Sequence, residues 1–306
     1  MQEEKEKRKN TVTEWSFSFE ELGDRAAEFF RSIGIKSEEH VRHEQFFAPL
    51  DGARSARVRL DLSVGQTTIT PLTSSENLCE ADLTYVGEIK FEYVGEAEKQ
   101  LTISNTSEGA DWFRSLFGWI GSGQKLRWDI ALNDAVPLDL DIHNGVGKGD
   151  FNLGTLNVEA LHLHGGVGEV TALLPGGAYS ARIDIGVGKH NLSIPAGANV
   201  NLRMSAGTGE VNLRIGEDAA VEADIDGGVG TCNVTVPVGA GVRVEFKAGL
   251  GNISLPSEMR RISGDKGDWN KSGVWESPNY ATAERPISIA FSGGVGELKV
   301  RYGGRA

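Results

Sequence analysis

Cysteine, long apolar runs and an N-terminal hydrophobic segment are scarce or missing in this 306-residue chain. Its two cysteines, Cys79 and Cys232, lie far apart, so they build neither a disulfide framework nor a zinc-finger spacing. No stretch reaches the roughly 18 consecutive apolar residues of a membrane-spanning helix. The opening residues MQEEKEKRKN are charged and no apolar segment follows them, so we expect no signal peptide. These absences predict a soluble, cytoplasmic protein that would reach the cell envelope only through a partner.

Positive charge is also in short supply. The chain has 31 lysines and arginines against 43 aspartates and glutamates, and its formal net charge is −12. Nucleic acids and anionic lipid surfaces are recognised through a positive surface, so we expect neither as the main partner. Hydrophobic residues make up 39% of the chain, which is enough for a packed core and excludes global disorder.

Glycine is the abundant residue, with 40 copies placed on a regular period. Successive glycine motifs lie 20 or 21 residues apart, except for the last one, which follows after 45 residues. The motif is GVG or one of its variants GTG and GLG, and its copies begin at Gly145, Gly166, Gly186, Gly207, Gly228, Gly249 and Gly294. This regularity indicates an internal repeat.

Apolar and polar residues alternate on both sides of each glycine motif. The positions three before, one after and six after the first glycine are predominantly apolar, as at Ile183, Val187 and Leu192. Alternation with a period of two is typical of a β-strand with one buried face. Two such strands cannot bury that face alone, but stacked units can. The sequence therefore predicts an all-β, single-domain β-solenoid with two parallel sheets and about 21 residues per coil.

Two polar columns fit in-register stacking of these coils. Opposite charges alternate three residues after the first glycine, and an amide ladder is expected two residues further on, although asparagine is also common on exposed strands. The charged column is Lys148, Glu169, Lys189 and Glu210, and the amide column is Asn191, Asn212 and Asn233.

Ahead of the solenoid we expect a disordered tail at 1–14, then an amphipathic helix and linker at 15–55. The helix should span 18–33, because its apolar residues fall on one face and Ser18 and Glu21 form a capping box. A solenoid end is an exposed sheet edge that needs covering. The helix is therefore expected either to cap the solenoid or to dock on a protein partner.

The solenoid itself is expected over 56–303, with an irregular first part. Ser63 and Tyr85 take the glycine position there, and the distance from Ser63 to Gly145 corresponds to about four coils. Segments 99–104 and 125–132 are expected to form the two strands of one coil. Two insertions interrupt the repeat, at 105–124 and at 257–286.

The serial GVG turns and LP-x-G turns, the segments LDLSVGQTTITPL and LCEADLTYVGEIKFEY, and the ending WESPNYATAERPISIAFSGGVGELKV resemble the toast-rack family of bacterial proteins. That family is related to LiaF-like C-terminal domains and to putative-adhesin β-solenoids. The resemblance covers roughly residues 50–303. It implies a single-stacked β-solenoid, often attached to membrane anchors or envelope-stress systems, with no established enzymatic activity and no catalytic residue to carry over.

The glycine motifs also look like phosphate-binding loops, but their context argues against that function. Such a loop lies between a strand and the N-terminus of a helix. Each GVG here joins two strands, and no lysine followed by serine or threonine completes a P-loop. We therefore expect no nucleotide or other cofactor at these turns.

A group of histidines and aspartates is the candidate metal site. His162 and His164 precede one glycine motif, and Asp141 and His143 take the equivalent positions one coil earlier. Asp184 follows in the next coil. Imidazole and carboxylate at strand spacing can hold zinc or a similar divalent ion. The alternative is a polar, solvated face, because ligands spread over a flat sheet do not easily converge on one ion.

The insertion 105–124 is the candidate partner-binding segment, because its clustered aromatic residues either cap the core or contact a protein. These residues are Trp112, Phe113, Phe117 and Trp119. Like charges are expected to stack between coils at Asp224 with Glu245 and at Arg182 with Arg203, as in the binding groove of a polysaccharide-active solenoid.

Three functions remain open at this point. The first is a non-enzymatic scaffold or interaction module without catalytic residues or cofactors. The alternatives are a carbohydrate-active β-helix enzyme and a metal-binding solenoid.

Overall fold

The computed structural model describes residues 41–105, 126–247, 250–264 and 272–303. These residues form an all-β structure of eighteen strands with one short 3-10 turn at Tyr280–Thr282. Within that part of the chain, no helix is long and apolar enough to cross a membrane. The expected tail at 1–14, the helix at 18–33 and the aromatic residues of the first insertion lie outside the described residues.

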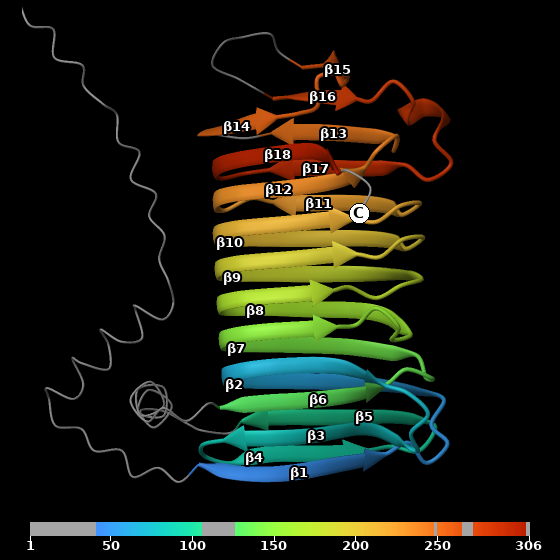
Figure 1. The fold of residues 1–306 in the computed structure, drawn as a ribbon, viewed down its shortest axis with the longest axis vertical. Helices are drawn as coiled ribbons and strands as arrows, with labels where there is room; N and C mark the ends of the chain where they lie inside the picture. Colours follow the sequence, from blue (N-terminus) through green and yellow to red (C-terminus); the bar gives the residue numbers. More distant parts are fainter. Residues whose placement is uncertain (1–40, 106–125, 248–249, 265–271, 304–306) are drawn as a thin grey trace, which may run out of the picture.

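Figure 1 shows the strands stacked as coils along the long axis of the molecule. Their bounds are β1 Arg42–Pro49, β2 Ser55–Leu72, β3 Asn77–Tyr85, β4 Ile89–Val94, β5 Glu98–Asn105, β6 Arg127–Asn133, β7 Leu138–Asn152, β8 Val158–Leu173, β9 Ala178–Ile194, β10 Asn199–Ile215, β11 Ala220–Asp226, β12 Val229–Pro237, β13 Val242–Lys247, β14 Leu250–Ser254, β15 Arg260–Ser263, β16 Gly273–Glu276, β17 Ile287–Ser292 and β18 Val295–Gly303.

The centre of the stack has the parallel register that the repeat predicts. Strands β7, β8, β9 and β10 each run through their glycine motif and pair in parallel along nearly their whole length. Gly147, Gly168, Gly188 and Gly209 lie side by side in this register. The expectation of two separate sheets is wrong, because strands that continue through the glycine corner join all eighteen into one mixed sheet.

The N-terminal end differs from the expected run of coils. Strand β2 pairs directly with β7, so Gly65 lies beside Gly147 with no coil between them. On its other side, β2 pairs with β5 and β6, which confirms the coil expected from segments 99–104 and 125–132. Strands β3 and β4 then run antiparallel to β6 and β5, and β1 runs antiparallel to β3.

The coil expected around Tyr85 therefore exists but runs in the reverse direction, and part of the expected linker is strand β1. The physical reason is that period-two alternation is the same read in either direction, so it predicts a strand and its buried face but not its polarity. The chain reverses between β2 and β3, where Ser74 has a φ of 57°.

The C-terminal end has a coil out of sequence order. Strand β17 pairs with both β11 and β13, and β18 pairs with both β12 and β14. The last coil of the chain thus lies between two coils that precede it, as the dark red β17 and β18 show in Figure 1. Asp224 and Glu245 each face Ala290, so their expected contact is wrong, whereas Arg182 does lie beside Arg203.

The second insertion contains structure of its own. Strands β15 and β16 pair with each other, and β16 pairs antiparallel with β13 at the end of the stack. Ser277 fixes the start of β13, because its hydroxyl accepts a hydrogen bond from the Val242 amide at 2.8 Å. This segment covers an edge that would otherwise offer unpaired backbone groups.

The core is a narrow aliphatic layer inside the coils. The columns three before and six after the first glycine are buried as expected, for example at Leu163, Ile183 and Leu192. The column one after the glycine was expected in the core, and this is wrong. In four coils the side chain points outward at the corner, where Val167, Val187, Val229 and Val295 are 42–55% exposed, whereas Val146 packs on a small buried cluster.

Candidate functional site

The histidine–aspartate group lies on the outer surface of the solenoid, on the parts of β7 and β8 that precede the glycine corner. Leu140 and Ile142 of β7 point into the core and are fully buried. Because side chains alternate along a strand, Asp141 and His143 point outward. The same alternation on β8 turns His162 outward, and the parallel register sets it beside Asp141.

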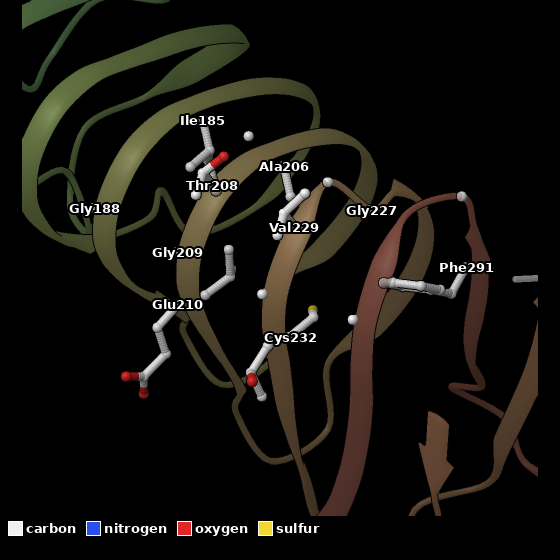
Figure 2. Close-up of a pocket in the computed structure, with 17 residues that line it drawn as sticks. Ile185, Gly188, Ala206, Thr208, Gly209, Glu210, Gly227, Val229, Cys232 and Phe291 are labelled. Carbon is white, nitrogen blue, oxygen red and sulfur yellow. The ribbon is translucent and has the colours of Figure 1, made fainter. Parts of the chain in front are cut away.

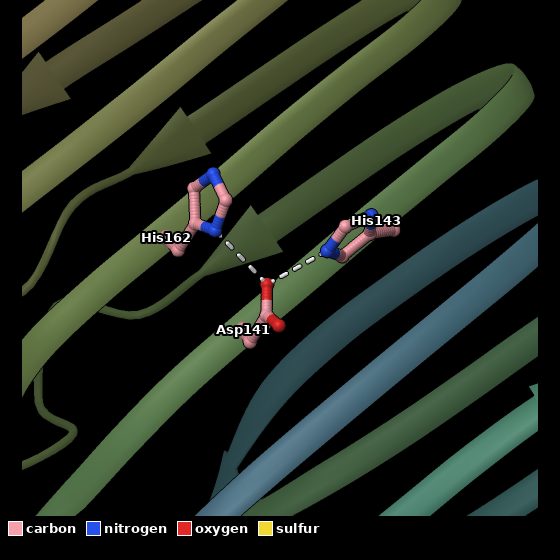
Figure 3. A group of neighbouring side chains, drawn as sticks. All are labelled: Asp141, His143 and His162. Atoms are coloured by element: carbon pink, nitrogen blue, oxygen red, sulfur yellow. Dashed lines mark ion pairs between the residues drawn. The ribbon is translucent and has the colours of Figure 1, made fainter.

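Asp141, His143 and His162 converge into what we call the His–Asp cluster. Asp141 Oδ1 lies 2.9 Å from His143 Nε2 and 3.3 Å from His162 Nδ1, as Figure 3 shows. One ligand atom of each residue lies within 4.8 Å of the other two. The three side chains are 24%, 33% and 37% exposed, so the cluster is half-buried and open on one side. Ligands on a flat sheet were expected to lie too far apart for one ion, but these three side chains converge.

Neighbouring coils support the His–Asp cluster with charged side chains. On the β9 side, His162 Nε2 lies 3.0 Å from Asp184 Oδ2, and Arg182 Nε donates to the same oxygen at 3.0 Å. On the β2 side, Arg59 Nη1 donates to Asp141 Oδ2 at 3.2 Å. These contacts fix the outer oxygen of Asp141 and the far nitrogen of His162.

Asp184 is held as a carboxylate. Burial alone would raise its pKa, but hydrogen bonds with His162 and Arg182 and the charge of Arg182 outweigh burial. The pKa of Asp184 is therefore lowered from its ordinary value. An ionised Asp184 favours the His162 tautomer that carries its proton on Nε2, with the Nδ1 lone pair directed toward Asp141.

The structure thus separates the five residues proposed from the sequence. Asp141, His143 and His162 come together, and Asp184 contacts the cluster through His162. His164 does not join them. Its exposed ring stacks on His143 with centroids 5.6 Å apart.

Sequence reasoning missed Arg59 and Asp61. Arg59 contacts both Asp61 and Asp141, and Asp61 Oδ1 lies 3.9 Å from His143 Nδ1. Both residues are on β2, which the spacing of the repeat placed about four coils away. No signal in the repeat shows that β2 is the direct neighbour of β7.

His190 differs from the histidines of the His–Asp cluster, because its side chain is buried in the core. In register it sits between Val170 and Val211, and its side chain packs over Gly165. Burial lowers the pKa of His190 to about 4. A signal for it was available, because the fourth residue after the first glycine is apolar in most other coils.

The glycine corners form a closely packed edge rather than an anion cradle. Figure 2 shows the hollow beside Thr208, Gly209 and Val229, whose volume of about 20 Å³ has room for about one water molecule. A side chain at Gly209 would overlap the carbonyl oxygen of Gly188. The exposed valines beside these corners make an apolar line along the edge, which we call the valine ridge: Val167, Val187, Val229 and Val295.

A wider hollow of about 1090 Å³ lies at the opposite edge, between the turns of the C-terminal coils. Its lining includes Glu217, Glu284 and Arg285. The guanidinium of Arg285 already has backbone partners there. It donates hydrogen bonds to the backbone oxygens of Gly197 and Ala198 at 2.8 and 2.9 Å, and to that of Asp218.

These features define a protein of stacked β-coils with polar side-chain ladders on its faces. Residues 35–193, just over half of the chain, match the family described as the N-terminal domain of toast_rack, DUF2154. The chain belongs to the toast-rack family, as its glycine repeat predicts.

Two solved structures are similar to the chain over most of its length. One is titled a putative cell adhesion protein from Clostridium sporogenes ATCC 15579; it is 19% identical, covers 86% of this chain and 100% of its own, and has a TM-score of 0.39. The other is titled a putative adhesin from Bacteroides fragilis NCTC 9343; it is 12% identical, covers 88% of this chain and 100% of its own, and has a TM-score of 0.36. No curated protein matches the chain.

Proposed function

We propose that this toast-rack protein is a non-enzymatic β-solenoid scaffold that presents its long surfaces to partner proteins. The observation that carries the proposal is the strict register of the coils. Polar side chains on the faces pair with their equivalents on the next coil, as Asn191, Asn212 and Asn233 do through amide hydrogen bonds of 3.0 and 2.9 Å, or with a neighbour two residues away on the same strand, as Arg182 does with Asp184. Such ladders make a rigid, regular surface and leave few polar groups directed at a substrate.

The valine ridge supports an interaction role. The ridge holds four half-exposed valines along one edge, with Thr208 between Val187 and Val229, and this is more apolar surface than scattered single residues would give. The ridge runs along the corner where the glycine backbones pack most closely, so its backbone is rigid and preorganised. A rigid apolar line favours binding because little conformational freedom is lost on contact.

The carbohydrate-active alternative has less support. A glycosidase needs two carboxyl groups facing each other across a cleft, about 5–9 Å apart. The stacked pair that the sequence suggested, Asp224 and Glu245, is separated by the β17 coil. The proposal keeps the cytoplasmic location expected from the sequence, with any link to the envelope made through a partner, and it keeps segments 18–33 and 105–124 as further partner-binding candidates.

Site-specific crosslinking tests the scaffold function. A photoreactive residue is placed at Val187 on the valine ridge or, as a control on the same strand, at the exposed position Ser180. In cells that express the protein, we expect discrete crosslinked products from position 187 and not from position 180. The substitutions Val167→Lys and Thr208→Lys should reduce the yield from position 187, because they place charge on the two coils beside it.

Equal crosslinking from positions 187 and 180, or a yield unaffected by the two lysines, would contradict partner binding at the ridge. Turnover of a polysaccharide by the purified protein would contradict the non-enzymatic role itself.

A further inference from the structure

We propose that the His–Asp cluster binds one zinc-like divalent transition-metal ion through Asp141 Oδ1, His143 Nε2 and His162 Nδ1. This site goes beyond the scaffold function and does not depend on it. The ion would join coil β7 to coil β8 on the outer face of the solenoid.

The separations of the three ligand atoms suit such an ion. Ligands about 2.0–2.1 Å from a tetrahedral zinc lie roughly 3.3 Å from one another. Asp141 Oδ1 lies 2.9 and 3.3 Å from the two imidazole nitrogens, and all three atoms fall within 4.8 Å of one another. Small side-chain rotations are therefore sufficient to bring all three onto one ion.

The hydrogen-bonding pattern leaves two of these three atoms without a hydrogen bond, although they approach each other to 2.9 Å as an ion pair. Asp141 Oδ1 and His143 Nε2 are both shielded from solvent, and neither has a hydrogen-bond partner among the described residues. His162 Nε2 is used by Asp184 at 3.0 Å, so in its neutral form His162 directs the lone pair of Nδ1 at Asp141. A cation between the three atoms would satisfy all of them at once.

The surroundings have the features of an outer shell around a metal site. A histidine that binds a metal commonly donates its other nitrogen to a carboxylate, which orients the ring and raises its basicity. Asp184 stands in that relation to His162, and Arg182 holds Asp184 in turn. Arg59 holds the second oxygen of Asp141, which leaves Oδ1 free to face the two histidines.

The donor set selects the class of metal. Two imidazoles and one carboxylate suit zinc, iron(II), cobalt, nickel and copper, whereas magnesium and calcium prefer oxygen ligands alone. Since the open side of the cluster faces solvent, water would complete the coordination. We therefore expect an exchangeable ion.

Calorimetric titration of the untagged full-length chain with zinc chloride tests the site, and cobalt(II) absorption gives a second readout. We expect one equivalent to bind the wild-type protein. The substitutions His143→Gln and His162→Gln should each weaken binding by more than about 100-fold, since each removes a ligand. Asp184→Asn should weaken it about 10- to 100-fold through the outer shell.

His164→Gln is the matched control, because His164 stacks on His143 but lies outside the ligand group. It should bind zinc like the wild type. The melting temperature of each variant is measured with chelator present and should equal that of the metal-free wild type. Loss of binding is then not confused with loss of folding.

Three results would overturn the proposal: no binding by the wild type, undiminished binding by a His143→Gln/His162→Gln double variant, or equal loss in His164→Gln. The cobalt spectrum of the wild type tests it without any substitution. Cys79 and Cys232 are buried in the core, so the spectrum should show visible d–d bands without a thiolate charge-transfer band in the near-ultraviolet. The presence of that band would place the metal elsewhere.

Discussion

Gly65 on β2 lies directly beside Gly147 on β7, although 82 residues separate the two glycines in the sequence. Strands β3, β4, β5 and β6, which come between them in the sequence, lie on the far side of β2 and build the N-terminal end of the stack. The same pairing brings Arg59 against the His–Asp cluster. Close packing of the glycine corners therefore supports both the stack and its candidate metal site.

The glycine corner should not tolerate a methyl group. Gly168 has a φ of 139°, and a β-carbon there would overlap the carbonyl oxygen of Gly147. We expect Gly168→Ala to lower the free energy of unfolding by about 3 kcal/mol or more. Gly197→Ala is the control, because its φ is also positive, at 72°, but the space around it is open. It should cost about 1 kcal/mol in urea unfolding. Similar losses in both variants would show that backbone conformation, not coil contact, requires the glycine.

His190 should make the protein less stable in mild acid. Burial lowers its pKa to about 4 from the ordinary value of 6.5. Between these values the unfolded chain binds a proton that the folded chain does not, so the free energy of unfolding falls as the pH falls from 6.5 toward 4. His190→Val matches Val170 and Val211 in its column and should remove this component, which we expect to be about 3 kcal/mol.

Urea unfolding of the wild type and of His190→Val at a series of pH values between 7 and 4 measures the difference. The stability curves of the two proteins should diverge below pH 6.5. Curves that stay parallel would show that His190 does not titrate as a buried group.

The amide ladder should depend most on its middle member. Asn212 donates to Asn191 at 3.0 Å and accepts from Asn233 at 2.9 Å. Asn212→Leu breaks both ladder hydrogen bonds and a third that Asn212 donates to Glu210 at 2.9 Å, and should cost about 1–3 kcal/mol, whereas Asn233→Leu breaks one ladder bond and should cost roughly a third as much. Thermal unfolding of the two variants compares them, and an equal shift in Tm would mean that the hydrogen bonds contribute independently of their place in the ladder.

Arg285 should anchor the C-terminal coil. It donates to the backbone oxygens of Gly197, Ala198 and Asp218, which belong to two preceding turns. Arg285→Ala should lower the free energy of unfolding by about 1–3 kcal/mol, because hydrogen bonds from a charged group are lost. Hydrogen exchange should speed up at β17. Arg214→Ala, at an exposed position in the same hollow, should leave both unchanged. Slow exchange at β17 in the Arg285 variant would refute the anchor.

The repeat in the sequence predicts the central coils well, because each copy specifies a strand, a corner and a buried face. Lys148, Glu169, Lys189 and Glu210 do lie in one column, as their alternating charges indicate. Three ligands of the metal hypothesis were found in the same way, since Asp141 and His162 hold equivalent positions in adjacent coils.

What the repeat does not contain is the order and direction of the coils at the two ends. The reversed strands β3 and β4 have the same alternation as parallel ones, and β17 has the same motif whichever neighbour it pairs with. For that reason Arg59 and Asp61 could not be placed at the cluster from spacing alone. The outward turn of Val187 was missed because alternation is interrupted at the glycine corner.

The placement of β17 and β18 between earlier coils has a consequence for synthesis on the ribosome. A solenoid whose coils follow the sequence can grow by adding each finished coil to the one before it. Here β13 and β14 have no parallel coil to dock on until β17 and β18 emerge, because these two strands are their parallel partners. The insertion of β17 and β18 is therefore the step that joins β13 and β14 to the rest of the stack.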